Sequence, residues 1–366
     1  MQVEQINIFN SDMDPENGGI QNTAYYFVRS FSKRFSVNGY TGRLPSRYKI
    51  PNIEIATSYS VLGVLRWLIK KCNNQNTINI AMNCWEAVPA LIVNKIRGTK
   101  YIVLAHGNDI YSLGNTNGFK QGIYDLINKR IFDNAALITC NSEYTRRLLK
   151  FDSYIEKSLV IHPPCLNFGE NNLEKKMERF HILSIGRLVE RKGFQFVIAS
   201  MPELLIKYPE LEYVIVGEGP YGSQLMDLVK KLSLEEHVRF LGRVSEQEKI
   251  EQYEKCSIFI MPSIEIPDDD TVEGFGIVYM EANQFGKYVI SGRCGGVPEA
   301  VIENVTGTIL DSVTKETVKE RLERSLEGLD ALYTEELIKK RKKWAELHFV
   351  DHIAEQYIEA IKTIEG

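Results

Sequence analysis

The chain has 366 residues, of which 44% are apolar and 25% charged, and its formal net charge at pH 7 is −4. This length suggests about two domains, and the composition is that of a soluble globular protein, which excludes a low-complexity chain. No apolar run reaches the ~18 residues that span a bilayer, and the first residues do not resemble a signal peptide, so we expect a cytoplasmic protein.

The charge is spread unevenly along the chain. Residues 1–165 hold 19 Lys and Arg against 12 Asp and Glu, a balance of +7, whereas the remainder holds 25 against 36, a balance of −11. A basic half suits an anionic partner, although uneven sequence drift explains the same counts. The six cysteines are scattered without CxxC spacing, which predicts buried thiols in a reducing compartment and no zinc or redox site.

Short apolar strands alternate with helical segments through the first half of the chain. The pattern predicts strands followed by amphipathic helices, which is typical of a parallel sheet covered on both faces. Pro163-Pro164 ends this series, and the polar segment 166–180 reads as a linker. The predicted strands are 6–9, 77–82, 101–105, 136–140 and 158–162, and the predicted helices are an amphipathic run ending near 35, 86–96, 122–132 and 143–150.

A second alternation follows the linker. It predicts strands at 181–186, 211–217, 238–242, 257–263, 287–292 and 306–311, with helices between them and three helical stretches at the end. The chain therefore offers two α/β domains, 1–165 and 166–349, each with a doubly wound parallel sheet. Because ligands bind such sheets beyond the carboxyl ends of the strands, we expect the site in a cleft between the domains.

Glycine-rich loops follow several predicted strands. Gly18-Gly19 permits close approach of the backbone to a ligand. Arg187 and Lys192 follow the strand 181–186, and two cations beside a helix start suit a diphosphate. Gly217-x-Gly219-x-x-Gly222 has the spacing of a dinucleotide fingerprint, so an NAD-dependent enzyme is an alternative. Two features weaken it: the motif lies in mid-domain, and Pro220 removes a backbone N–H from the turn.

The segment TVEGFGIVYMEA, residues 271–282, places Glu273 before Gly-Phe-Gly and Glu281 within the next helix. Eight residues at 3.6 per turn put the two carboxylates about 80° out of phase, so they cannot share one proton or one metal. The helix start between them has unpaired N–H groups and a dipole that favours an anion. We expect the two carboxylates to accept hydrogen bonds from sugar hydroxyls on either side of a phosphate.

Asp268-Asp269-Asp270 offers hard oxygen ligands for Mg²⁺ or Mn²⁺. Consecutive acids on a loop are more often a solvated surface patch. We therefore expect no metal at this segment.

The ordered set of motifs resembles the retaining glycosyltransferases of family 4, which have the GT-B fold. The resemblance spans nearly the whole chain and implies two Rossmann-like doubly wound domains facing across a cleft, with the last helix, 350–366, returning to the first domain. The motif DTVEGFG resembles the branch that uses GDP-mannose. The motifs that carry the resemblance are HGND (106–109), NSEYT (141–145), PPCLN (163–167), GRLVERKGF (186–194), VGEGP (216–220), VRFLGRV (238–244), EGFGIVYMEA (273–282) and GGVPEAV (295–301).

The resemblance implies roles for individual residues. Glu281 would bind the ribose of the donor, and Glu273 would contact the transferred sugar, with His106 beside it. Arg187 and Lys192 would hold the diphosphate, which the amides of the helix start would cap. The expected catalytic residues are Glu273, His106, Arg187 and Lys192, and the expected donor-binding residues are Gly18, Gly19, Arg187, Lys192, Gly242, Arg243, Val244, Glu273, Gly274, Phe275, Gly276, Ile277, Val278 and Glu281.

The activity that the resemblance implies is retaining, metal-independent transfer of a hexose, with mannose favoured, from a nucleotide-diphosphate sugar to a lipid-linked or glycan acceptor in surface polysaccharide or glycolipid biosynthesis. Apart from this donor substrate, we expect no cofactor. Another GT-B enzyme, such as an epimerase or hydrolase, and a non-catalytic nucleotide-sugar binder are the alternatives. We expect no nucleic-acid partner. A basic face formed by Arg29, Lys33 and Arg34, with Phe31 and Phe35 nearby, is a candidate contact with an anionic membrane, which would place the enzyme peripherally on the inner face of the cytoplasmic membrane.

Overall fold

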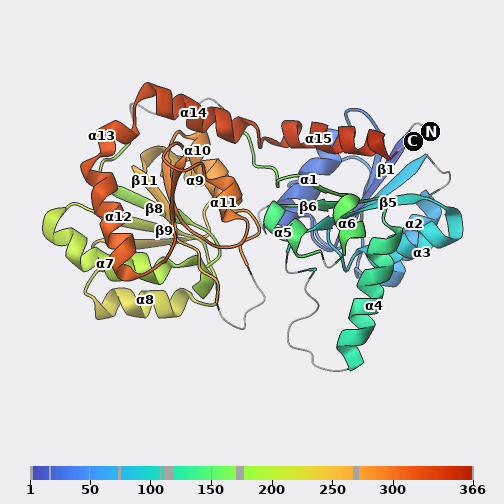
Figure 1. The fold of residues 1–366 in the computed structure, drawn as a ribbon, viewed down its shortest axis with the longest axis horizontal. Helices are drawn as coiled ribbons and strands as arrows, with labels where there is room; N and C mark the ends of the chain where they lie inside the picture. The colour runs from blue at the N-terminus through green and yellow to red at the C-terminus, as the bar shows by residue number, and fades with distance from the viewer. Residues whose placement is uncertain are drawn as a thin grey trace. The chain divides into compact units, whose positions relative to one another are not determined.

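The computed structural model describes residues 3–15, 18–48, 50–72, 76–107, 109–110, 119–149, 151–169, 177–266 and 272–364. The chain divides into two compact units. Unit 1 comprises Met1–Pro164 and Val350–Gly366, and unit 2 comprises Cys165–Phe349. Each unit contains one parallel sheet with helices on both faces (Figure 1).

The sheet of unit 1 has the strand order β3-β2-β1-β4-β5-β6-β7, and every neighbouring pair is parallel. The strand order reverses between β1 and β4, which makes this the switch point where doubly wound sheets bind ligands. The strands are β1 (Gln5–Asn10), β2 (Ser36–Thr41), β3 (Ile53–Ile55), β4 (Thr77–Ala81), β5 (Lys100–Ala105), β6 (Leu137–Cys140) and β7 (Ser158–Val160).

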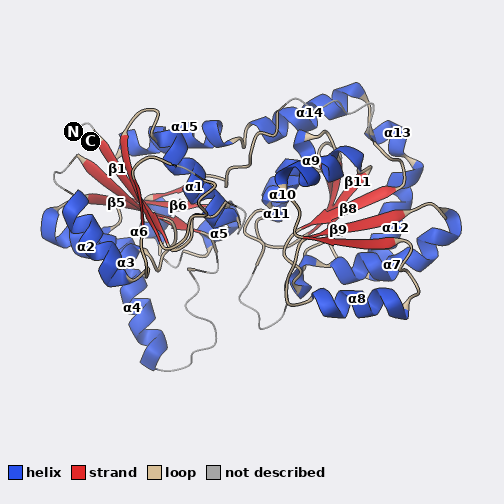
Figure 2. Ribbon diagram, turned by 180° about the vertical axis from the view of Figure 1, so that it is seen from behind, coloured by secondary structure: helices blue, strands red, loops and turns tan. Residues whose placement is uncertain are grey.

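Helices cover both faces of this sheet. One apolar core lies between the sheet and α2, α3 and α4, and the other lies between the sheet and the helices α1 and α15 (Figure 2). The amino-terminal part of α4 projects beyond the sheet of unit 1 (Figure 1). The helices of unit 1 are α1 (Gly19–Phe31), α2 (Val61–Lys71), α3 (Ala87–Arg97), α4 (Phe119–Asn134), α5 (Glu143–Arg147), α6 (Asp152–Glu156) and α15 (Val350–Thr363).

Helix α15 packs along α1 through aromatic and charged contacts. The Tyr357 ring lies 4.6 Å from that of Phe27, and its hydroxyl donates to Thr139 at 3.1 Å. Lys33 pairs with Asp351 at 2.8 Å, and Arg34 pairs with Glu355 at 2.7 Å.

These contacts change the interpretation of the predicted basic face of α1. Two of its three cations, Lys33 and Arg34, face carboxylates of α15, and the guanidinium of Arg29 lies 5.8 Å from the Tyr25 ring. Phe31 is fully buried because it belongs to the core beneath α1. This face therefore offers an anionic membrane less positive charge and less aromatic surface than the sequence suggests.

The sheet of unit 2 has the order β10-β9-β8-β11-β12-β13 and is also parallel throughout. Its order reverses between β8 and β11, so the loops that follow these two strands flank the switch point. The strands are β8 (His181–Ile185), β9 (Glu212–Val216), β10 (Val238–Gly242), β11 (Ile258–Met261), β12 (Tyr288–Gly292) and β13 (Gly307–Leu310).

In unit 2, α7, α8 and α12 lie on one face of the sheet, and α9 and α10 lie on the other (Figures 1 and 2). The helical elements are the 3₁₀ helix η2 (Glu190–Lys192) and the α-helices α7 (Phe194–Lys207), α8 (Gly222–Lys231), α9 (Glu246–Lys255), α10 (Ile277–Gln284), α11 (Val297–Ala300), α12 (Lys315–Glu327), α13 (Leu329–Leu332) and α14 (Glu335–Glu346).

The helical pattern of residues 339–364 is divided between the two units. Helix α14 ends at Glu346, α15 begins at Val350, and the intervening His348 carbonyl accepts from Cys165 N–H at 2.8 Å. Helix α14 is anchored by Arg341, whose guanidinium is fully buried between two tyrosine rings and donates to the carbonyls of Val305 and Gly286.

Candidate active site

The loops after β8 and β11 bring Glu273 against two cations. Arg191 Nη1 lies 3.1 Å from Glu273 Oε2, and the Lys192 ammonium donates to the same oxygen. Both cations lie in η2, which is closed by Gly193 at φ 77°. A Cβ on Gly193 would lie 2.1 Å from the Pro262 carbonyl oxygen, so only glycine lets the two loops approach this closely.

Glu273 is an ionised carboxylate in a nearly closed environment. Its side chain is 13% exposed. Burial raises its pKa, but the charges of Lys192 and Arg191 and their hydrogen bonds outweigh burial, so the pKa of Glu273 lies below its ordinary value. The backbone of Glu273 is also fixed, because its carbonyl accepts from Gly296 N–H at 2.9 Å. The GGVPEAV motif thus supports the loop that carries the carboxylate.

Helix α10 begins directly after this loop. Its N-cap is Gly276 at φ 96°, where a Cβ would lie 2.4 Å from the Tyr279 ring. Among the described residues, the backbone N–H groups of Ile277 and Val278 have no hydrogen-bond partner. The positive end of the helix dipole is therefore available to an anion. The Phe275 side chain is 2% exposed and packs against His348.

Glu281 lies within α10 and contacts a different set of partners. Lys249 Nζ lies 2.9 Å from its Oε1, and the Tyr253 hydroxyl donates to its Oε2 at 2.8 Å. Lys249 and Tyr253 are four residues apart on α9, which starts at Ser245 with a capping box. Sequence reasoning missed both residues and also missed Arg191. The i, i+4 spacing on a capped helix was the available signal.

The remaining predicted donor-site residues of unit 2 lie at the carboxyl edge of the same sheet. Arg187 is exposed, and its guanidinium forms no ion pair or hydrogen bond with any described residue. Gly242, at φ 63°, ends β10 and its carbonyl accepts from Gly217 N–H at 2.8 Å. Arg243 is exposed, and Val244 is partly buried.

Gly217 and Gly219 of the fingerprint-like motif allow two loops to pack closely against each other. A Cβ on Gly217 would lie 2.0 Å from the Gly186 carbonyl oxygen, and one on Gly219 would lie 2.2 Å from that of Leu188. The motif follows β9, so it lies on the second βα turn of the unit, where a dinucleotide fingerprint is not expected. Its spacing is explained by close contact with the loop that carries Arg187.

Unit 1 holds the other predicted site residues. Gly18, at φ 149°, is the N-cap of α1, and Gly19 is its first residue. The His106 ring lies at the end of β5, where Nε2 is 2.8 Å from the Met82 carbonyl oxygen. Asp109 accepts from the backbone N–H groups of His106 and Cys84, so it fastens the loop after β5 to the loop after β4.

Sequence reasoning also missed Glu86, which lies beyond the switch point of unit 1. Its Oε1 accepts from Ser11 N–H at 2.7 Å, which ties the loop after β4 to the loop after β1. Burial raises the pKa of Glu86 to about 7 despite hydrogen bonds from Ser11, Asn83 and Tyr59 that lower it. Burial therefore makes this carboxyl group easier to protonate than an exposed glutamate.

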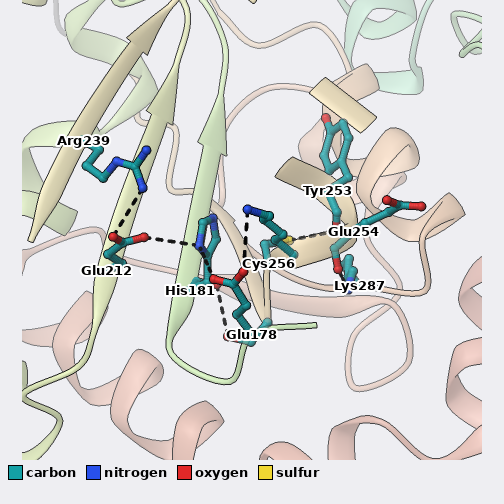
Figure 3. Close-up of polar contacts among 10 residues, drawn as sticks. Glu178, His181, Glu212, Arg239, Tyr253, Glu254, Cys256 and Lys287 are labelled. Atoms are coloured by element: carbon teal, nitrogen blue, oxygen red, sulfur yellow. Dashed lines mark hydrogen bonds and ion pairs between the residues drawn. The ribbon is translucent and has the colours of Figure 1, made fainter. Parts of the chain in front are cut away.

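The opposite edge of the unit 2 sheet carries a separate polar cluster (Figure 3). His181 begins β8 and is 3% exposed, with Nδ1 3.6 Å from carboxylate oxygens of both Glu178 and Glu212. Arg239 pairs with Glu212 at 3.4 Å. Lys287 is fully buried and donates to the Glu254 carbonyl at 2.9 Å. This cluster lies at the amino ends of the strands, away from the edge that carries Glu273.

Asp268–Asp270 lie outside the described residues, so the expectation of a solvated patch rather than a metal site there stays a prediction. Among the residues that are described, no group of three or more His, Cys, Asp or Glu is arranged to hold a metal ion. In the same part of the chain, no helix is both long and apolar enough to cross a membrane.

Known proteins resemble this chain in sequence and in fold. The sequence model of the glycosyl transferases group 1 matches residues 169–361. The GDP-mannose-dependent alpha-(1-6)-phosphatidylinositol monomannoside mannosyltransferase of Mycolicibacterium smegmatis is 32% identical over 203 residues, 52% of this chain and 53% of that protein. The phosphatidylinositol N-acetylglucosaminyltransferase gpi3 subunit of Schizosaccharomyces pombe is 31% identical over 140 residues, 38% of this chain and 29% of that protein. The chain thus spans about half the length of the first of these relatives.

Solved structures agree on the fold. Anabaena HepE in complex with UDP superimposes with a TM-score of 0.77 at 19% identity, over 99% of this chain and 100% of that one. Sucrose-phosphate synthase from Thermosynechococcus elongatus gives 0.78 at 16% identity, over 99% of both chains. The expected GT-B fold is confirmed. With the model of the family matching more than half of its residues, this chain belongs to the glycosyl transferases group 1.

Proposed function

We propose that this chain is a retaining glycosyltransferase that moves a hexose, with mannose favoured, from a nucleotide-diphosphate sugar to a lipid-linked or glycan acceptor. The observation that carries the proposal is the Glu273 carboxylate, held by Arg191 and Lys192 beside the unpaired N–H groups that begin α10. The names of two relatives support this choice, since that of the Mycolicibacterium smegmatis protein specifies GDP-mannose and both specify phosphatidylinositol lipids.

The proposed donor pose follows the carboxyl edge of the unit 2 sheet. The diphosphate binds at the N–H groups of Ile277 and Val278, with the exposed Arg187 and with Lys192 as the neighbouring cations. Glu281 accepts hydrogen bonds from the ribose, and residues 242–244 line the base.

The proposed chemistry is cleavage of the bond between the anomeric carbon and the diphosphate through an oxocarbenium-like transition state. Negative charge grows on the leaving phosphate, where Arg187, Lys192 and the helix start stabilise it. The acceptor oxygen attacks from the same face and passes its proton to the leaving phosphate, so the configuration is retained. Glu273 orients the transferred sugar. Because cations of the chain balance the diphosphate, the reaction needs no metal and no cofactor.

The experiment that tests this proposal incubates the full chain with GDP-mannose, UDP-glucose or UDP-N-acetylglucosamine, with and without phosphatidylinositol in mixed micelles. Sugar transfer that requires the lipid and gives an α-linked product supports the proposal. Release of free sugar regardless of the lipid indicates a hydrolase, and interconversion of the nucleotide sugar indicates an epimerase. Donor binding without any turnover indicates a non-catalytic binder, and each of these three results overturns the proposal.

The proposed location follows from the acceptor. A lipid-linked acceptor is available only at a membrane surface, so the enzyme works in the cytoplasm as a peripheral protein on the inner face of the membrane. Sedimentation with anionic vesicles at low and high salt tests this part of the proposal, because electrostatic docking weakens as salt is added.

A further inference from the structure

A groove lies in unit 1 between α4 and the segment around α6. Its volume is about 360 Å³, within the ~300–1,000 Å³ of small-molecule and cofactor sites. The floor consists of buried apolar side chains, among them Phe132, Leu149 and Tyr154, each 4% exposed. The groove therefore offers an apolar surface from which the surrounding protein excludes most water.

Large apolar side chains also stand at the mouth of the groove. Leu126 on α4 is 55% exposed, and Phe151 on the other wall is 49% exposed. Ile123, one turn earlier on α4, is 42% exposed. Apolar surface that continues from a groove onto its mouth is typical of a site for an apolar ligand.

One polar group lies among these apolar walls. Asn128 lines the groove and is 6% exposed, yet its amide oxygen has no hydrogen-bond partner among the described residues. Buried amides are normally hydrogen-bonded, because an unpaired one loses its hydration without compensation. The Asn128 amide is therefore suited to a polar atom of a ligand that is otherwise apolar.

The rim carries charges of both signs, since Asp125 and Lys129 line the groove and Lys129 pairs with Asp133. The Lys129 ammonium lies 5.8 Å from the Phe151 ring centroid and 2.9 Å from Asp133, and the Lys157 ammonium lies 5.6 Å from the Tyr154 ring centroid. In both lysines the ammonium itself lies over an aromatic ring. The apolar floor and the buried amide match the acyl chain and the ester of a lipid, and the two lysines are cations that its phosphate could approach.

We propose that this groove binds one acyl chain of a glycerophospholipid acceptor, with the Asn128 amide hydrogen-bonded to the ester and the lysines of the rim near the phosphate. The proposal rests on the proposed function for the identity of the acceptor, since the relatives' names specify phosphatidylinositol lipids. The groove thereby assigns unit 1 a subsite for the apolar part of the acceptor.

Calorimetry without any donor tests the proposal. The probe is lysophosphatidylinositol below its critical micelle concentration, and glycerophosphoinositol is the chain-free comparison. We expect the lyso-lipid to bind at least tenfold more tightly than the headgroup, and the double variant Leu126→Gln/Phe151→Gln to lose that tenfold advantage. Both positions are about half exposed, so the variant should fold, and its thermal unfolding checks this. Equal affinity of the variant and the wild type overturns the proposal.

A matched control uses another exposed apolar residue of the same unit. Leu62 on α2 is 53% exposed, close to the 55% of Leu126. Leu62→Gln should leave lyso-lipid affinity within twofold of the wild type. An equal loss in both variants would show general adhesion to apolar surface and would overturn the assignment.

Photocrosslinking locates the chain directly. A lysophosphatidylinositol with a diazirine near the middle of its acyl chain should label peptides that contain residues 122–134 or 149–154. Labelling confined to α2, or to unit 2, overturns the proposal. Because neither experiment contains a nucleotide sugar, failure here leaves the transferase assignment to be judged by the turnover experiment, and failure of turnover leaves the groove to be judged by binding.

Discussion

The two edges of the unit 2 sheet both carry paired charged groups, yet they differ in which positive groups are left without a partner. At the amino edge, Glu212 pairs with Arg239 and Glu178 with Lys255, while His181 lies between the two carboxylates. At the carboxyl edge, Glu273 and Glu281 are paired as well, at 13% and 9% side-chain exposure.

The difference lies in what remains unpaired. The carboxyl edge keeps an exposed Arg187 without an ionic partner and the two N–H groups that start α10, within the described part of the chain. The amino edge pairs its cations within the protein. Pairing of charge therefore does not by itself mark a ligand site. The proposed site is distinguished by positive groups that have no partner within the protein. These groups lie next to ion-paired carboxylates at the switch point of the sheet.

The largest effect is expected for Glu273→Gln. The substitution keeps the shape of the side chain but removes the charge that Arg191 and Lys192 hold. We expect turnover to fall at least 100-fold, about 3 kcal/mol in transition-state stabilisation. Steady-state kinetics measures this, with thermal unfolding as the check on folding. The amino-edge variant Glu212→Gln is the matched control and should keep wild-type turnover; a Glu273→Gln enzyme with half the wild-type rate would contradict the comparison.

The next effect concerns donor affinity. Glu281→Ala removes the proposed ribose acceptor, and a lost hydrogen bond to a charged group costs about 1.5–3 kcal/mol, or roughly 10- to 100-fold in affinity. Calorimetric titration with GDP-mannose and UDP-glucose measures the change. Lys249→Met tests whether the loss reflects the carboxylate itself, because it keeps Glu281 and removes only its ion pair. Unchanged donor affinity in Glu281→Ala would refute this placement.

A smaller effect concerns the amino edge, where His181 should make the stability of the protein depend on pH. Burial lowers the pKa of His181 below its ordinary value of about 6.5, and the charges of Glu178 and Glu212 only partly oppose this. The folded state then binds this proton less readily than the unfolded chain, so wild-type stability falls as the pH drops below about 6.5. His181→Asn should show a shallower fall in melting temperature between about pH 7.5 and pH 5.5, and parallel curves for the two proteins would argue against this.

The smallest effect is expected for metal removal. If cations of the chain balance the diphosphate, turnover in excess EDTA should equal that of the untreated enzyme within error. Rates measured before and after chelation, and again after addition of Mn²⁺, provide the check. If EDTA abolishes turnover and Mn²⁺ restores it, the prediction is wrong and the acidic segment 268–270 becomes the candidate metal site.

The sequence predicted the fold class well because apolar strands buried on both faces leave a clear pattern. Strand β10 was predicted with its observed bounds, Val238–Gly242, and α7 (Phe194–Lys207) lies where a helix was predicted between the first two strands of unit 2. Four elements of unit 1 were missed: β2 has the mixed sequence of Ser36–Thr41, β3 has only three residues, α2 follows a turn-like segment, and α6 has only five residues. Tertiary pairing with β1 makes β2 a strand, and a local pattern cannot show such pairing.

The candidate site was predictable only in part. Motifs identified the residues of the loops after β8 and β11, because glycines at strand ends are visible in the sequence. The partners Lys249 and Tyr253 come from α9, and Arg191 was overlooked in favour of Lys192. Which cation faces which carboxylate depends on how the loops fold over the switch point, and no spacing rule gives that. The predicted helix 143–150 was also too long, since α5 ends at Arg147.

The return of α15 to unit 1 has a consequence for biosynthesis. Phe27 and its neighbours on α1 are buried by Ile353, Tyr357 and Ile361. On the ribosome, unit 1 therefore cannot complete this core until residues 165–349 have been synthesised, which takes roughly 10 to 40 s at about 5–20 residues per second. Unit 2 is continuous in sequence and can close its core first. The unit that emerges first is thus the last to be finished, and during that interval the apolar face of α1 is available to chaperones.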